Sequence, residues 1–212
     1  MNLQEMKGQY DAVFSLGHLC LSAIQLRKNN LRPFAGPIDW MTSHSLADVN
    51  RLLRNRFSDF MRPVNLRVLG YNTGEKEEGS TIYVRDDYYV VESVHDFDAD
   101  QNTLDDLMTY PEVMEKYNRR INRFMEQMSE SNRILFVRTE GSLEEARELE
   151  LVLSELVQHD FSVLFVRHTD VTGIVEIDWP LEKICAVELP DTEIWEGNNA
   201  LWSELFEGIT LV

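Results

Sequence analysis

The chain has 212 residues, of which 43% are hydrophobic and 27% are charged, a composition that fits one compact domain covering residues 1–212. Its 37 acidic and 20 basic residues give a net charge of −17, which disfavours nucleic acid and anionic membranes as partners because like charges repel. No apolar run approaches the ~20 residues that span a bilayer, and the N-terminus does not resemble a signal peptide. Two cysteines, Cys20 and Cys185, supply neither a disulfide framework nor a zinc-binding spacing. We expect a cytoplasmic protein without a metal or cofactor.

The N-terminal part of the chain predicts a strand, a helix, a rigid loop and a second helix. Residues 11–16 form a β-like run, and a helix is expected over residues 20–28. Residues 31–42 combine prolines and a glycine with large apolar side chains, which predicts an ordered loop. Ser45 fits the N-cap of a helix whose apolar residues recur with the helical period up to Phe60.

Residues 65–94 contain three short β-like runs separated by turn signals, which predicts an antiparallel insertion. A long amphipathic helix is expected from Pro111, with an apolar stripe that continues to Met128. The remainder alternates between strands at 133–137, 162–166 and 184–189 and helices at 143–158 and 198–207. Continuously apolar strands between helices are typical of buried parallel strands. The predicted fold is therefore α/β, a three-layer sandwich with a mostly parallel sheet and an antiparallel β insertion.

Cys20 is the candidate nucleophile of the sequence. It lies where the first helix begins, and the partial positive charge and unpaired N–H groups at a helix start would favour the thiolate and could hold an oxyanion. The alternative is a small buried hydrophobic residue. Cys185 lies within an apolar strand and is assigned no role.

A cysteine nucleophile needs a base, and two histidines are candidates. His95 and His168 each end a predicted strand, where the ligand crevice of a parallel sheet is expected. Either could instead be a half-exposed polar residue without a role in catalysis. His18, His44 and His159 are expected at the surface.

Arg120 lies beside the apolar stripe of the long helix, and a partly buried guanidinium needs a carboxylate partner. Asp39, in the rigid loop, is the predicted partner. Alternatively, Asp39 orients the catalytic histidine, or Arg120 or Arg138 binds a substrate carboxylate or phosphate. The chain could also be a scaffold, or a non-catalytic module that binds a small anion through Arg138, Glu140, His168 and Asp170.

Several segments together resemble a known family: Ser15-Leu-Gly-His-Leu-Cys20, Leu31-Arg-Pro-Phe34, Pro37-Ile-Asp-Trp40, His95-Asp-Phe97, Arg119-Arg-Ile-Asn-Arg-Phe124 and Ile134-Leu-Phe-Val-Arg138. They resemble a bacterial family of unknown function whose members are described as papain-like cysteine peptidases. The resemblance covers nearly the whole chain. It implies that Cys20 is the nucleophile and His95 the base, and it does not identify the third member.

The predicted function is therefore a cysteine-dependent hydrolase, similar to a peptidase or amidase, in which a Cys20–His95 pair carries out acyl transfer with Asp39 as the orienting acid. The expected substrate is a small amide, ester or peptide. A thiol acyltransferase would use the same residues. The candidate substrate-binding residues are Arg138, Glu140, His168 and Arg120.

Overall fold

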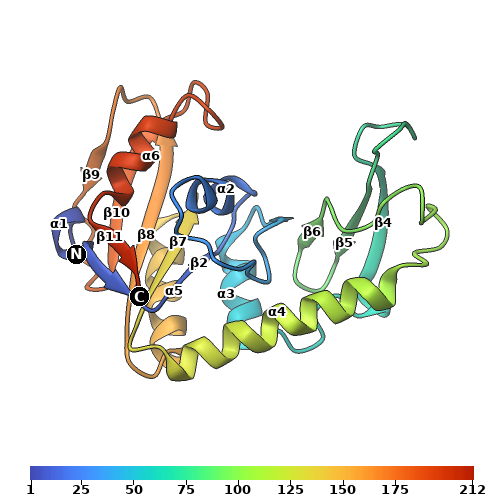
Figure 1. Cartoon of the computed structure of the whole chain (residues 1–212), viewed down its shortest axis with the longest axis horizontal. Helices are drawn as coiled ribbons and strands as arrows, with labels where there is room; N and C mark the ends of the chain where they lie inside the picture. The colour runs from blue at the N-terminus through green and yellow to red at the C-terminus, as the bar shows by residue number, and fades with distance from the viewer.

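The computed structural model describes all residues, 1–212, and contains a central sheet of five strands (Figure 1). In sheet order these strands are β2 (Ala12–Ser15), β7 (Arg133–Thr139), β8 (Asp160–Thr169), β10 (Ile184–Pro190) and β9 (Val175–Ile177). The first four are parallel to one another, and β9 pairs antiparallel with β10 at the edge. The predicted α/β fold with a mostly parallel sheet is confirmed.

Alternating side chains along each central strand serve two separate cores, because successive residues of a strand point to opposite faces. In β7, Ile134 and Phe136 belong to the larger core, whereas Leu135 and Val137 belong to the smaller one. The larger core is covered by α3 (Leu46–Arg54), α4 (Tyr110–Glu130) and α5 (Leu143–Leu156), and the smaller one by α2 (Leu21–Lys28) and α6 (Asn199–Phe206). Helices on both faces of the sheet make the three layers that the sequence predicts.

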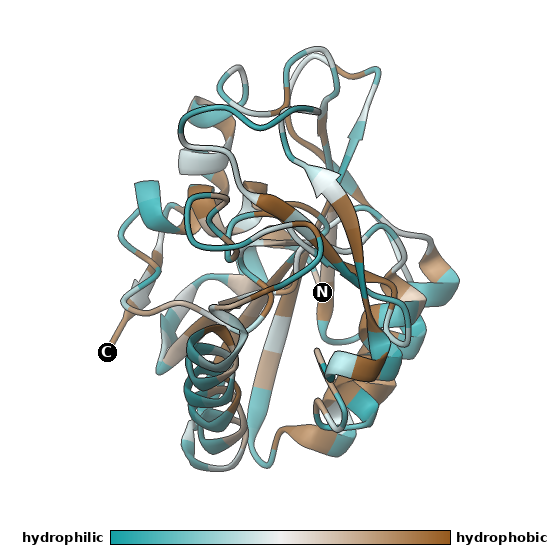
Figure 2. Ribbon diagram, turned by 90° about the vertical axis from the view of Figure 1, so that its right-hand side faces the viewer, coloured by the Kyte–Doolittle hydropathy of each residue, from teal (hydrophilic) through white to brown (hydrophobic).

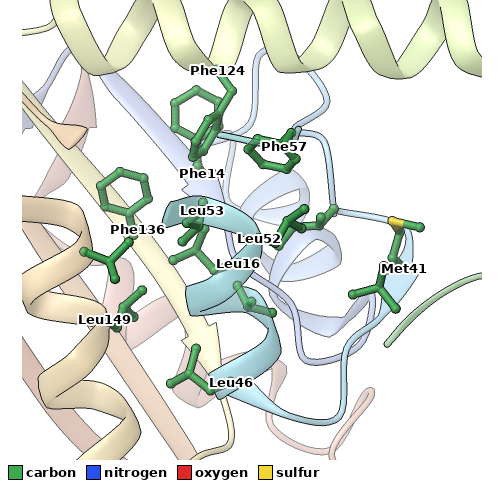
Figure 3. Packing of buried hydrophobic residues seen from close by; sticks show 14 of the residues in the cluster. Phe14, Leu16, Met41, Leu46, Leu52, Leu53, Phe57, Phe124, Phe136 and Leu149 are labelled. Carbon is green, nitrogen blue, oxygen red and sulfur yellow. The ribbon is translucent and has the colours of Figure 1, made fainter. Parts of the chain in front are cut away.

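Aromatic rings from four different segments meet in the larger core (Figure 3). The ring of Phe14, on β2, lies 4.7 Å from that of Phe124 on α4, and the ring of Phe57 lies 5.6 Å from Phe124. Phe136, on β7, completes the group. These contacts fix α4 against the sheet, and Figure 2 shows hydrophobic segments gathered in the interior with hydrophilic ones along the loops and outer helix faces.

An antiparallel sheet is inserted between α2 and α4, as predicted. In sheet order its strands are β3 (Met41–Thr42), β6 (Val91–Ser93), β5 (Ile82–Asp86) and β4 (Leu66–Tyr71). The long helix α4 runs from this sheet back to the central one (Figure 1). Ile82 and Val84 belong to the same buried cluster as Phe14. The insertion is therefore packed onto the central unit through a shared core.

The second predicted helix is shorter than expected, because α3 ends at Arg54 instead of continuing to Phe60. Arg56, Phe57 and Asp59 adopt positive φ angles of 49°, 59° and 61°, a left-handed conformation that cannot continue an α-helix. Phe57 and Phe60 nevertheless remain buried. Their helical spacing therefore reflected burial in the core and not helical backbone.

Several short elements were not predicted from the sequence. They are α1 (Leu3–Met6), the 3-10 turn η1 (Pro63–Asn65), a parallel pair formed by β1 (Gly8–Tyr10) and β11 (Ile209–Leu211), and the strands β3 and β9, of which β3 lies in the segment expected to be a loop. The β1–β11 pair brings residues from the two ends of the chain side by side (Figure 1). None of the helices combines the length and the apolar character needed to cross a membrane.

Candidate active site

The chain after β2 and the chain after β7 leave the central sheet toward opposite faces. The helix that follows β2, α2, packs in the smaller core, whereas the helix that follows β7, α5, packs in the larger one. In open α/β sheets such a divergence marks the place where ligands commonly bind, beyond the carboxyl ends of the two strands. Here Gly17 and His18 follow β2, Thr139 and Glu140 lie at the end of β7, and a 3.0 Å hydrogen bond from the Thr139 N–H to the Gly17 carbonyl joins the two segments.

Arg138, near the end of β7, donates its hydrogen bonds to other groups of the protein. It is fully buried, and its guanidinium donates hydrogen bonds to the Leu16 and Ser43 carbonyls, the Ser43 hydroxyl and the Glu140 carbonyl over 2.8–3.1 Å. Burial without an ion partner lowers the pKa of Arg138 to about 9. The donors of Arg138 are thus used to hold loops together, and a contact of Arg138 with substrate stays a prediction.

Gly17 is required by the same packing. Its φ of +82° favours glycine, and a Cβ atom there would lie 2.5 Å from the Ser43 hydroxyl oxygen and 3.1 Å from the Arg138 guanidinium. Any larger residue would displace the Ser43 hydroxyl, which accepts a hydrogen bond from the buried guanidinium. The glycine before His18 thus allows the first turn after β2 to pass directly over Arg138.

Three histidines and a glutamate gather near the carboxyl ends of β2, β7 and β8. The His168 Nδ1 lies 2.7 Å from a Glu140 carboxylate oxygen, and the His18 Nε2 lies 3.3 Å from the His44 Nδ1. Burial, the Arg138 charge and His44 lower the pKa of His18 to about 4. The expectation that His18 is a surface residue is thus only partly met, because its ring is half-buried in this cluster.

Cys20 lies at the N-cap of α2, as predicted, but its surroundings do not favour the thiolate. The residue is 8% exposed. Burial and the negative charges of Asp39 and Asp96 raise the pKa of its thiol to about 11, and the hydrogen bond from its own backbone N–H does not offset them. The expectation of a thiolate stabilised by the helix start is therefore wrong for this resting arrangement, in which the thiol keeps its proton at neutral pH.

Asp39 is held in fixed geometry, although by a different arginine from the one predicted. Its Oδ2 lies 2.6 Å from the Arg32 Nε and accepts a 2.8 Å hydrogen bond from the Gly36 N–H. Arg120 acts on Asp39 only at longer range. No histidine is bonded to Asp39, so its role as an orienting acid stays a prediction. Arg32 was missed because an arginine beside a proline carries no signal of its partner.

His95 lies at the rim of an open hollow of about 310 Å³ that is lined by Trp40, His95, Asp96, Lys116 and Arg120. The His95 side chain is exposed, and its ring lies 6.3 Å from that of Trp40 in an edge-to-face arrangement. No hydrogen bond joins the Cys20 thiol to His95 or to His168 in this unliganded state. Catalytic contacts often tighten only when substrate is bound.

Asp96 connects this hollow to Cys20, and sequence analysis did not single it out. It accepts hydrogen bonds from Lys116, Tyr117 and the Ser93 hydroxyl, the last over 2.6 Å. Burial opposes its ionisation, but these bonds outweigh burial and lower the pKa of Asp96. The same carboxylate raises the pKa of Cys20. Its place next to His95 within the His-Asp-Phe motif was the available signal.

The site residues therefore fall into two groups. Asp39 and Asp96 both act on the charge of the Cys20 thiol, and Asp96 lines the hollow beside His95, whereas His168 and Glu140 belong to the histidine cluster with His18. Arg120 lines the hollow beside His95. No three His, Cys, Asp or Glu side chains are arranged to hold a metal ion.

Comparisons with known proteins identify the family of the chain. A family model described as "Putative papain-like cysteine peptidase (DUF1796)" matches residues 11–171. An uncharacterized protein of Acanthamoeba polyphaga mimivirus is 26% identical over 217 residues, covering 92% of this chain and 97% of its own length. Because this relative is viral, similarity to the chain is not confined to bacteria. No solved structure matches.

Proposed function

Because the chain belongs to the family described as papain-like cysteine peptidases, we propose that Cys20 is the nucleophile of a hydrolase acting on a peptide or another small amide or ester. The observation that carries this proposal is the hollow beside His95. It offers a substrate an open surface next to Trp40, and the Asp96 carboxylate that lines it is close enough to Cys20 to act on the charge of the thiol.

His95 is a better candidate for the base than His168. The charges that act on Cys20 are those of Asp39 and Asp96, and Asp96 lines the same hollow as His95. His168 instead has its Nδ1 bound to Glu140 and acts electrostatically on His18. The exposed His95 ring is free to turn toward the thiol when a substrate excludes water from the hollow.

Because the pKa of Cys20 is about 11, the proposed attack is coupled to proton removal and does not start from a stable thiolate. The sulfur–carbon bond forms as the thiol proton moves to the His95 imidazole, and the carbonyl electron pair becomes an oxyanion. The unpaired N–H groups in the first turn of α2 are the candidate donors to this oxyanion.

Collapse of the tetrahedral intermediate reforms the carbonyl and breaks the bond to the leaving group, which takes the proton back from His95. Water then attacks the thioester, with His95 again as the base, and regenerates the thiol. If another nucleophile replaced water in this second step, the same residues would carry out acyl transfer. Product analysis in the presence of added amines distinguishes the two outcomes.

The test is a screen of fluorogenic peptides and activated esters against four proteins: wild type and the Cys20→Ser, His95→Asn and His168→Asn variants. We expect Cys20→Ser to lose activity by about 1,000-fold or more, since a serine hydroxyl is a far weaker nucleophile at neutral pH. His95→Asn should lose about 100-fold, and the matched His168→Asn variant should lose much less.

Cys185→Ser is the control for the thiol, because Cys185 is fully buried in β10 and should not affect turnover. Intact mass spectrometry after mixing with an activated ester should show one acyl group in wild type and none in Cys20→Ser. A Cys20→Ser protein that is unstable but fully active would show that Cys20 is a core residue and would overturn the proposal.

A further inference from the structure

Basic residues are concentrated on one face of this acidic protein. The chain carries 20 basic residues against 37 acidic ones, yet Arg27 and Arg32 lie with their guanidiniums 5.7 and 5.0 Å from the centre of the Trp40 ring. Along α4, further basic side chains line the hollow beside His95 and a second hollow next to it. These are Lys116, Arg119, Arg120 and Arg123.

The two hollows form one continuous basic surface, which we call the α4 basic face and define by the four α4 residues just listed together with Phe34 and Trp40. Each hollow has a volume of about 310 Å³, and both are lined by Lys116 and Arg120. The spacing of residues 116, 119, 120 and 123 places the four side chains on one side of the helix. Phe34 and Trp40 supply apolar walls.

The positive charge of this face is only partly neutralised within the protein. Lys116 is paired with Asp96, and Arg119 has a loose, exposed contact with Glu115 at 3.5 Å. Arg120 and Arg123 are half-buried and form no ion pair, and the guanidinium of Arg123 lies 4.9 Å from the centre of the Phe34 ring. Like charges three and four residues apart destabilise a helix, and the ion pairs of Lys116 and Arg119 offset only part of that cost.

We propose that the α4 basic face binds an oxyanionic group of the substrate, a carboxylate or a phosphate, with Arg120 and Arg123 as its main ligands and Lys116 in support. Two guanidiniums free of internal partners can each donate paired hydrogen bonds to an oxyanion. The substrate class is then an acidic or phosphorylated peptide whose charged group lies over α4 while its scissile bond lies near Cys20. This inference rests on the proposed function for the place of the scissile bond, but the anion site itself does not.

The experiment measures binding without turnover, using the full-length Cys20→Ser protein and fluorescence anisotropy. Four labelled peptides of the same sequence differ at two central positions, which hold Glu, Gln, phosphoserine or Lys. We expect the Glu or phosphoserine peptide to bind at least about tenfold more tightly than the Gln peptide, and added salt to weaken that binding. The ranking of Glu against phosphoserine tells which oxyanion the site prefers.

The variant R120Q/R123Q should abolish the preference for the anionic peptides. The matched control is Arg147→Gln, an exposed arginine on α5 that lines neither hollow, which should leave that preference within about twofold of the parent. If the double variant does not fold, Arg123→Gln alone, at the outer end of the face, should weaken anionic binding at least threefold. Equal binding of the Glu, phosphoserine and Gln peptides, or a preference unchanged in these variants, overturns the proposal.

These outcomes are separate from the test of catalysis. Loss of activity in Cys20→Ser together with equal binding of all peptides would refute the anion site and still support the proposed hydrolase function. Selective, arginine-dependent binding in a protein whose activity does not need Cys20 would support the anion site and refute the hydrolase.

Discussion

The reactivity of Cys20 provides a direct test of the electrostatics described above. With a thiol pKa of about 11, the thiolate fraction at pH 7 is about 10⁻⁴, compared with about 3% for an exposed thiol of ordinary pKa. Alkylation by iodoacetamide at pH 7 should therefore be about 300-fold slower than that of a small-molecule thiol, before any steric hindrance. The rate should rise about tenfold per pH unit, without a plateau below pH 9.5.

The Asp96→Asn variant tests how much this carboxylate contributes to the raised pKa of Cys20, because the substitution removes the charge and nearly preserves the shape of the side chain. The pKa of Cys20 is raised by burial first and by the carboxylates second, so the variant should label several-fold faster at pH 7. The gain should stay below the ~300-fold that a full return to an ordinary thiol pKa would give. Asp39→Asn should act in the same direction.

The assay is mass spectrometry of the alkylated peptide in a Cys185→Ser background, with the Cys20→Ser protein as the blank. A labelling midpoint near pH 6 or 7 in wild type would refute the reasoning, because it would mean that a cation, such as the His95 imidazolium, stabilises a resting thiolate. Unchanged labelling in Asp96→Asn would refute the role assigned to that carboxylate.

The remaining predictions concern stability. The pKa of His18 falls from 6.5 to about 4 on folding, so the unfolded chain binds this proton at a higher pH than the folded protein does. The free energy of unfolding should therefore fall between pH 6.5 and pH 4, by at most about 3 kcal/mol from this residue. Urea unfolding of His18→Asn should show a weaker dependence on pH over this range. The pKa of Glu140 is lowered because the hydrogen bonds and charge of His168 outweigh burial. Its contribution to the free energy of unfolding is therefore present above pH ~4.3 and lost as the pH falls further. Glu140→Gln should remove this part of the loss of stability in acid, and an unchanged dependence of stability on pH would contradict the prediction. Arg138→Met leaves the carbonyls of Leu16, Ser43 and Glu140 without their donor. The free energy of unfolding, measured with heat or urea, should fall by about 3 kcal/mol or more. A fall of less than about 1 kcal/mol would show that water replaces the guanidinium.

Much of the fold could be predicted from local patterns. Continuous apolar runs predicted the strands β2, β7, β8 and β10, and a helical apolar stripe predicted α4. Because strands of a parallel sheet are buried on both faces, such runs fit few other kinds of structure. The 55–62 segment could not be predicted, because its phenylalanines keep a helical spacing while the backbone turns. The β1–β11 pair also escaped prediction, since each strand has three residues and is stabilised by a partner about 200 residues away.

The candidate site was less accessible to sequence reasoning. The position of Cys20 at a helix start was correctly inferred, but the pKa of its thiol is raised by burial first and by the carboxylates of Asp39 and Asp96 second, and both effects arise only in the folded chain. Arg138 illustrates the same limit. An arginine at a strand end is equally consistent with a ligand contact and with a structural role, and only the positions of Leu16 and Ser43 reveal the structural one.

The central sheet also sets the smallest fragment worth expressing. The family match ends at residue 171, but β10 pairs with β8 along seven residue positions, and Trp202 and Leu205 of α6 are fully buried in the smaller core. A protein trimmed at residue 171 would present the edge of β8 as an open template for intermolecular pairing, with an uncovered apolar layer beside it. Cloning boundaries and fusion tags should therefore follow the sheet and retain the chain through β11.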